Sequence, residues 1–301
     1  MSTYQSVKTQ YASSSNGDFA YRRFSAADGT PLLFLMHFRG TMDKWDPLLI
    51  NSIAQARPVI LVDYRGVGQS SGRVAPSFRE SAADLAEFLS LIGVKKIDIL
   101  GFSIGAFVAQ LLALNHRAVL EIQHVVICGS SSSVGPDMPE TANDYVTDAT
   151  VPDLKLEHFK SLFFPRTPAG EKAAEEWWAR TTERSERTSG EKSTDWASQG
   201  LKDDGKAMMA QGQAYGAFQK AESSRDEDGS YDRLGELDVP VLVAQGSDDY
   251  VFPTVNSFHL SQKLPDAQLV IYANSGHGFL YQYAELFAKH VVAFLETRRS
   301  I

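Results

Sequence analysis

The fold of this chain is decided by one stretch, Ile97-Asp98-Ile99-Leu100-Gly101-Phe102-Ser103-Ile104-Gly105-Ala106-Phe107-Val108-Ala109. It reads as a short apolar strand, a Gly-x-Ser-x-Gly turn and the start of a helix. A turn this tight has no room for side chains two residues before and two residues after the serine, and Gly101 and Gly105 occupy those positions. Taken alone, the motif also fits a buried strand that ends in a flexible turn. If the motif is instead a tight turn between a strand and a helix, Ser103 lies at its apex with the hydroxyl exposed. The first amides of the helix, which have no intrahelical partner, then point toward the same place.

Apolar runs on both sides of this stretch indicate further strands. Residues 32–37 and 58–63 are apolar almost throughout, which is typical of strands buried on both faces of a sheet. Residues 122–128 are predicted as the next strand. Helices are predicted between these strands, at 47–55, 77–92 and 104–117. The alternation predicts an α/β fold, with a mostly parallel twisted sheet flanked by helices and right-handed crossovers.

The N-terminal part predicts a different pairing. Residues 4–11 and 18–24 are predicted as two strands, separated by the turn signal Ser13-Ser14-Ser15-Asn16-Gly17. We expect an antiparallel hairpin at one edge of the sheet.

The alternation stops at Gly129 and resumes near residue 239. The intervening residues are richer in charge and contain three helical candidates, at 153–164, 170–184 and 203–221. Beyond them come a strand at 239–244, a helix at 255–264, a strand at 267–272 and a closing helix at 283–297. The closing helix is predicted to align Leu286, Phe287, His290, Val291, Phe294 and Leu295 on one face. We predict a core of residues 1–129 and 236–301, with residues 130–235 inserted as a helical cap, or lid.

Three predicted strand ends carry groups suited to nucleophilic catalysis. Ser103 follows the strand at 97–102, Asp248 and Asp249 follow the strand at 239–244, and His277 follows the strand at 267–272. Ligands of parallel sheets bind beyond the carboxyl ends of the strands, where these residues would meet. A serine hydroxyl needs a base to take its proton, and an imidazole base needs a carboxylate to fix its tautomer. Spacing alone does not choose between the two aspartates.

On these motifs the chain resembles the α/β-hydrolase fold superfamily along nearly its whole length. The Asp-Tyr-Arg-Gly-Val-Gly-Gln-Ser stretch at 63–70 and the short acid loop resemble its esterase and non-haem haloperoxidase-like branch, which uses a serine nucleophile. The resemblance implies that Ser103 is the nucleophile and His277 the base. The family pattern places its aspartate four residues before a proline, which selects Asp249 over Asp248. It also implies an oxyanion hole made by the backbone amides of Phe38 and Ile104.

The remaining candidates surround this site. Arg39 would either recognise a substrate carboxylate or pair with Asp43 or Asp46, and we expect the local pairing because loop arginines usually contact nearby carboxylates. The resemblance makes His37 a structural residue beneath the oxyanion loop. From the cap, Trp178 and Tyr215 are predicted to line an apolar pocket.

Cofactor and metal motifs are not evident in the sequence. Gly66, Gly68 and Gly72 do not match Gly-x-Gly-x-x-Gly, since Ser71 holds the third place. A Gly-x-x-x-x-Gly-Lys sequence that continues with serine or threonine does not occur, because Ala207 follows the match at residues 200–206, and no His-Glu-x-x-His helix occurs either. We expect no cofactor and no metal.

Composition limits the classes of partner. The 301 residues are 43% apolar and 22% charged, as in ordinary globular proteins, and the formal net charge of −8 argues against nucleic-acid binding. The single cysteine, Cys128, excludes an intrachain disulfide and is predicted to be a buried thiol at a strand end. No secretory signal or membrane-spanning run is visible. We expect a cytoplasmic protein, a monomer or homodimer, with a small-molecule substrate.

The sequence therefore predicts a serine hydrolase that cleaves an ester, lactone or related acyl compound of mainly apolar character. Two alternatives stay open. A carbon–carbon hydrolase or an acyltransferase would use the same three residues, and a receptor-like homologue would bind a ligand with little turnover.

Overall fold

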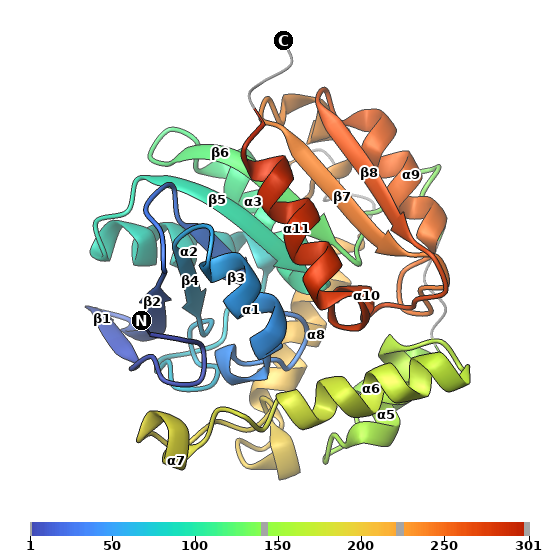
Figure 1. The fold of residues 1–301 in the computed structure, drawn as a ribbon. Coiled ribbons are helices and arrows are strands. Elements are labelled where there is room, and N and C mark those ends of the chain that lie inside the picture. Colours follow the sequence, from blue (N-terminus) through green and yellow to red (C-terminus); the bar gives the residue numbers. More distant parts are fainter. Residues whose placement is uncertain (1, 140–143, 221–225, 298–301) are drawn as a thin grey trace.

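The computed structural model describes residues 2–139, 144–220 and 226–297. Within these ranges eight strands form one sheet in the order β1-β2-β4-β3-β5-β6-β7-β8 (Figure 1). The strands are β1 (Gln10–Ser14), β2 (Gly17–Phe24), β3 (Leu32–Leu35), β4 (Val59–Val62), β5 (Lys96–Phe102), β6 (Glu121–Cys128), β7 (Val241–Gly246) and β8 (Ala267–Tyr272). The six strands from β4 to β8 in this order are parallel, and β2 pairs antiparallel with β1 and β4. The predicted mostly parallel sheet is confirmed.

The first strand lies later in the chain than predicted. The hairpin strand is β1, not residues 4–11, and the chain reverses at Ser15 and Asn16. Tyr4 is fully buried, and its hydroxyl donates to the carbonyl of Met42, while its amide donates to the side chain of Asn51. Residues 4–6 therefore form a turn that packs against the core, because burying this aromatic ring competes with strand pairing.

Helices cover both faces of the sheet. The helices α1 (Pro47–Ala54) and α11 (Ala284–Leu295) pack together on the face that is in front in Figure 1, and α2 (Phe78–Leu91) packs with α3 (Ile104–Asn115) behind it. Strands β3, β4 and β7 are consequently buried along their whole length. α9 (Thr254–Lys263) packs on β7 and β8. None of the helices in the described ranges is both long and apolar enough to cross a bilayer.

The closing helix departs from its predicted face. In α11 the buried residues include Phe287, Val291, Phe294 and Leu295, as expected, but Leu286 is 44% exposed. Ala284 and Ala288 fill the positions that complete the buried stripe. His290 is half-buried, and its Nδ1 is paired with the Tyr272 hydroxyl at 2.7 Å. The buried residues 284, 287, 288, 291, 294 and 295 follow the helical spacing of three and four residues, and Leu286 does not fall on this stripe.

The segment between β6 and β7 is helical. It contains α4 (Tyr145–Ala149), α5 (Leu156–Phe163), α6 (Pro168–Arg180), α7 (Glu186–Ser189) and α8 (Lys206–Phe218), together with the short 3-10 turns η2 (Gln199–Leu201) and η4 (Tyr231–Glu236). Three of these helices correspond to the predicted ones but are shorter, and α4 and α7 were not predicted because four or five residues give no helical period. We call residues 130–235 the inserted segment. Its predicted C-terminal boundary falls inside η4.

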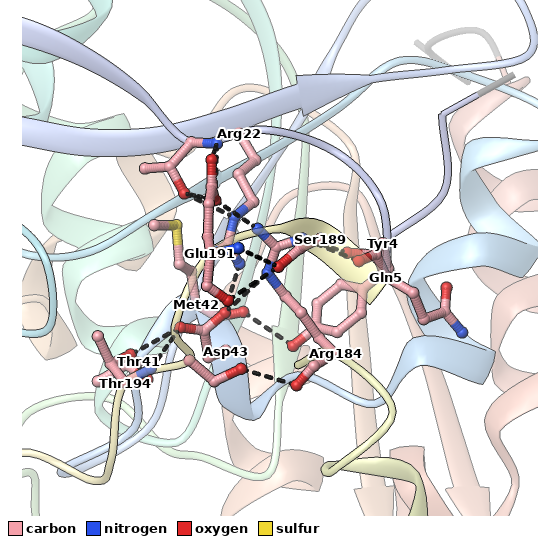
Figure 2. Close-up of polar contacts among 12 residues, drawn as sticks. Tyr4, Gln5, Arg22, Thr41, Met42, Asp43, Arg184, Ser189, Glu191 and Thr194 are labelled. Carbon is pink, nitrogen blue, oxygen red and sulfur yellow. Dashed lines mark hydrogen bonds and ion pairs between the residues drawn. The ribbon is translucent and has the colours of Figure 1, made fainter. Parts of the chain in front are cut away.

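A buried polar cluster joins the inserted segment to the N-terminal part of the core (Figure 2). Asp43, in the turn η1 (Met42–Lys44), pairs with Arg22 at 2.7 Å and with Arg184 at 3.2 Å. Arg184 also pairs with Glu191 at 2.7 Å, and Glu191 accepts from the amide of Thr9. Arg22, Asp43 and Arg184 are buried, so these are ion pairs in a region from which water is excluded.

Candidate active site

Ser103 occupies a strained turn between β5 and α3. Its φ of 58° and ψ of −123° lie outside the regions that residues with side chains ordinarily adopt. A Cβ on Gly101 would collide with the carbonyl of Gly105, and a Cβ on Gly105 would collide with the carbonyl of Leu35. These collisions explain why both positions require glycine. The Ser103 side chain opens into a cavity and not to bulk solvent, since the residue is only 5% exposed.

Asp249 and His277 form a buried pair. His277 Nδ1 donates to Asp249 Oδ2 at 2.8 Å, while Oδ1 accepts from the amides of Val251 at 2.7 Å and Phe252 at 2.9 Å. Because Nδ1 carries its proton toward a carboxylate, Nε2 of the neutral ring is left with its lone pair. Asp248 is exposed, and its carboxylate accepts from the neighbouring Ser247 hydroxyl. The structure thus brings Asp249 to the histidine and leaves Asp248 at the surface.

The imidazole of His277 is enclosed by aromatic rings. Its centroid lies 4.8 Å from that of Phe102, 5.2 Å from that of Phe163 and 5.7 Å from that of Phe252. A Cβ on Gly129 would lie 3.2 Å from the ring, so this glycine, with a φ of +54°, permits the close approach of the backbone. These contacts restrict how far the ring can rotate.

Two residues that line the cavity have backbone amides without an acceptor in the described part of the chain. Within the described residues, neither the amide of Phe38 nor that of Ile104 donates a hydrogen bond to the protein. Ile104 is the first residue of α3, whose first-turn amides have no intrahelical partner. Phe38, Ile104, Ser103 and His277 line the same cavity. No hydrogen bond joins Ser103 to His277 in the described part of the chain, and such contacts often tighten only when substrate binds.

The cavity has a volume of about 340 Å³ and is mainly apolar. Its walls come from the strand ends and from the inserted segment, and they consist of His37, Phe38, Ser103, Ile104, Tyr145, Val146, Ala149, Thr150, Leu154, Phe159, Leu162, Phe163, Gly212, Tyr215, Val251, Phe252 and His277. None of these described lining residues is a lysine, arginine, aspartate or glutamate. A charged ligand group would therefore be desolvated here without an ionic partner, which is costly.

Two of the three predicted pocket residues lie elsewhere. Tyr215 lines the cavity, whereas Trp178 does not, because its ring packs against those of Phe159 and Trp196 within the inserted segment. The predicted pocket residues do not include Tyr145, Val146, Ala149 and Thr150, which lie in α4 and at its end. The available signal was the spacing of Tyr145 and Ala149, four residues apart, but one turn of helix is too short to recognise.

Arg39 is neither a pocket residue nor a partner of Asp43 or Asp46. It is fully buried, and its guanidinium donates to the carbonyls of Val151 at 2.6 Å and Ala197 at 2.8 Å in the inserted segment. The expected pairing fails because Asp43 is bound by Arg22 and Arg184, and Asp46 by Arg180. Burial lowers the pKa of Arg39 to about 10.

His37 is a buried neutral residue beside the Phe38 loop. Its Nδ1 donates to the carbonyl of Phe38 at 2.8 Å. Burial lowers the pKa of His37 to about 3, and the neighbouring His277 acts in the same direction. The ring therefore stays uncharged at neutral pH and is bound to the backbone of Phe38.

The glycine loop after β4 is filled by the protein's own side chains. Gly68 lies directly against the carboxylate of Asp63, and Gly72 packs against the side chain of Arg65.

Cys128 is buried, and burial raises the pKa of its thiol well above the ordinary value. Among the described residues, no group of three or more His, Cys, Asp or Glu side chains is placed to hold a metal ion.

Comparisons with known proteins agree with this architecture. The model of the α/β-hydrolase fold family matches residues 30–282. A proposed carbamate hydrolase of Azorhizobium caulinodans is 24% identical over 289 residues, which cover 94% of this chain and 97% of that protein. A non-haem chloroperoxidase of Streptomyces lividans is 28% identical over 294 residues, covering 92% and 95%. The solved structure of an α/β-hydrolase fold protein from Chitinophaga pinensis is 29% identical, with a TM-score of 0.83 over 99% of this chain and 100% of that one. The chain belongs to the α/β-hydrolase fold family.

Proposed function

We propose that this protein is a serine hydrolase that cleaves an uncharged ester, lactone or related acyl compound through an acyl-enzyme. The observation that carries the proposal is the buried Asp249–His277 hydrogen bond of 2.8 Å at the cavity that Ser103 lines. A carboxylate, an imidazole and a hydroxyl at one cavity are the parts that nucleophilic acyl transfer requires.

The proposed reaction begins when Ser103 Oγ attacks the acyl carbon and His277 Nε2 takes the hydroxyl proton. Asp249 holds the Nδ1 proton and stabilises the imidazolium. The amides of Phe38 and Ile104 donate to the oxyanion that forms on the carbonyl oxygen. The intermediate collapses when His277 returns the proton to the leaving alcohol. Water then attacks the acyl-enzyme, passing a proton to His277, and the second intermediate releases the acid and the free serine.

The cavity supports an apolar, uncharged substrate. Its volume of about 340 Å³ lies within the range of small-molecule sites, and most of its wall is hydrophobic. We propose that the inserted segment acts as the cap, since Tyr145, Phe159, Phe163 and Tyr215 supply much of that wall. The name of the Azorhizobium caulinodans relative refers to a carbamate. A carbamate is also an acyl compound, and the same chemistry would cleave it.

The test compares the wild type with Ser103→Ala on chromogenic esters of graded acyl length and with a fluorophosphonate probe. We expect an ester signal that depends on Ser103, an optimum in acyl length and labelling of the wild type alone. Labelling without ester turnover would favour a different acyl compound or the carbon–carbon hydrolase alternative. If the wild type neither turns over esters nor reacts with the probe, the proposal fails and the receptor-like alternative replaces it.

A further inference from the structure

The inserted segment touches the loop of His277 through the last residue of α5, Phe163. The amide of Gly278 donates to the carbonyl of Phe163 at 2.7 Å. The Phe163 ring is buried, lines the cavity and lies edge-on to the His277 imidazole. Among the described residues, the other two rings against this imidazole, Phe102 and Phe252, belong to the core. Phe163 is thus the aromatic contact that the inserted segment makes with His277.

The two glycines that flank His277 are explained by Phe163. Neither Gly276 nor Gly278 has a positive φ, so their backbone conformations do not call for glycine. A Cβ on Gly278 would instead lie 2.9 Å from Phe163 Cβ and 3.2 Å from its carbonyl oxygen. A Cβ on Gly276 would lie 2.8 Å from the same oxygen. Real Cβ atoms almost never approach so closely, so a side chain at either position would push Phe163 and the histidine loop apart.

We propose that Phe163 is a positioning residue for His277, so that the seating of α5 on the Gly276-His277-Gly278 loop sets the alignment of the base. The proposal rests on the proposed function, in which His277 takes the proton of Ser103. The carbonyl of Phe163 fixes the loop and its ring fixes the imidazole. Proton transfer depends steeply on such geometry, and a displacement of about 1 Å can cost about 100-fold in rate.

The test uses Gly278→Ala and Phe163→Leu in the full chain. Gly278 does not line the cavity, so Gly278→Ala is expected to lower kcat for the best chromogenic ester by about 10- to 100-fold while KM stays unchanged. The maximal rate at which a fluorophosphonate labels Ser103 should fall by a similar factor. Phe163→Leu removes the ring contact and should lower the same maximal rate, together with a change in KM because Phe163 is also part of the wall.

Two matched variants separate positioning from packing. Phe164→Leu removes a buried ring next in sequence, which contacts Trp177 and lies outside the cavity wall. Gly216→Ala adds a methyl group where no atom lies within 4 Å. Both should keep the wild-type kcat, and thermal melting should confirm that every variant is folded.

The outcomes distinguish failure of this inference from failure of the proposed function. If wild-type labelling does not depend on Ser103, the proposed function fails and the inference fails with it. If labelling depends on Ser103 but Gly278→Ala and Phe163→Leu react at the wild-type maximal rate, Phe163 is only a wall residue and the inference is overturned. Where Gly278→Ala does not fold, Phe163→Leu against Phe164→Leu decides the question alone.

Discussion

Replacing Asp43 should reveal how strongly the buried polar cluster holds the inserted segment to the core. Asp43 Oδ1 faces Arg22 at 2.7 Å and Arg184 at 3.2 Å, and Oδ2 accepts from the amide and the hydroxyl of Thr194, each at 2.8 Å. Arg22 Nη2 already has no hydrogen-bond partner among the described residues. Asp43→Asn keeps the shape of the side chain but removes the carboxylate that pairs with Arg22 and Arg184 (Figure 2). Arg184 retains Glu191, whereas Arg22 is left without an ion-pair partner among the described residues.

The expected loss is large because Arg22 stays buried without its carboxylate partner. Removing one partner of a buried ion pair costs about 3 to 5 kcal/mol, since it leaves an uncompensated charge. The new amide would also turn its NH2 group toward either Arg22 or the Thr194 amide, both of which are donors. The matched control is Glu175→Gln, which breaks the exposed pair with Lys160 and should cost less than about 1 kcal/mol.

The measurement is urea unfolding of the two variants and the wild type, followed both by tryptophan fluorescence and by circular dichroism. We expect the Asp43→Asn midpoint to fall well below that of the control with an unchanged slope. A loss no larger than that of Glu175→Gln would refute the reasoning, because it would mean that water or a rearranged side chain solvates the arginines.

The contribution of Asp43 to the free energy of unfolding should depend on pH in a defined direction. Burial opposes ionisation of Asp43, but Arg22 and the Thr194 hydrogen bonds outweigh it, so the pKa of this carboxyl lies below its ordinary value. The folded state therefore binds a proton less readily than the unfolded chain. The stabilisation by Asp43 is complete above the unfolded pKa, about 3.9, and is lost as pH falls through the folded pKa. Asp43→Asn should abolish this part of the acid dependence.

Three further predictions concern the site and its frame. Asp249→Asn should lower kcat by about 10⁴-fold, whereas Asp248→Asn should leave kcat near that of the wild type, as ester hydrolysis would show. Gly105→Ala should lower the unfolding free energy by about 3 kcal/mol or more in urea titrations, because its Cβ has no space beside Leu35. The pKa of His37, lowered to about 3, predicts that stability is lost as pH falls from about 6.5 toward 3; His37→Gln should remove that loss, up to about 5 kcal/mol, in titrations across this range.

The parts of the structure that the sequence predicted correctly depend on short-range rules. The Ser103 turn follows from the collisions that Gly101 and Gly105 avoid, and these collisions involve residues within the motif and one neighbouring strand. The parallel strands follow from apolar runs covered on both faces. The family pattern of an aspartate four residues before Pro253 selects the carboxylate that the structure pairs with His277. Each of these rules acts over a few residues.

The errors share a different origin. Arg39 was expected to pair with a carboxylate a few residues away, but its partners are carbonyls more than 100 residues distant. Trp178 was assigned to the pocket because it is an aromatic residue of the inserted segment. Its position depends instead on how α6 packs against Trp196. Residues 4–6 turn inward because Tyr4 finds a buried site near Met42. In all three cases a long-range contact outweighs the local preference, and a single sequence carries no record of that contact.

The contacts of Arg39 and Phe163 together bear on how the proposed enzyme works. Arg39 follows Phe38, one of the proposed oxyanion donors, and is bound by carbonyls of the inserted segment, while its own amide donates to Gln211 on α8 at 2.8 Å. Phe163 accepts from the loop that carries His277. The inserted segment is therefore bound to both the loop of the oxyanion donor and the loop of the base. Because the same segment supplies much of the cavity wall, a substitution that shifts the whole segment should change kcat as well as KM, whereas Gly278→Ala, at a residue outside the wall, should change kcat alone.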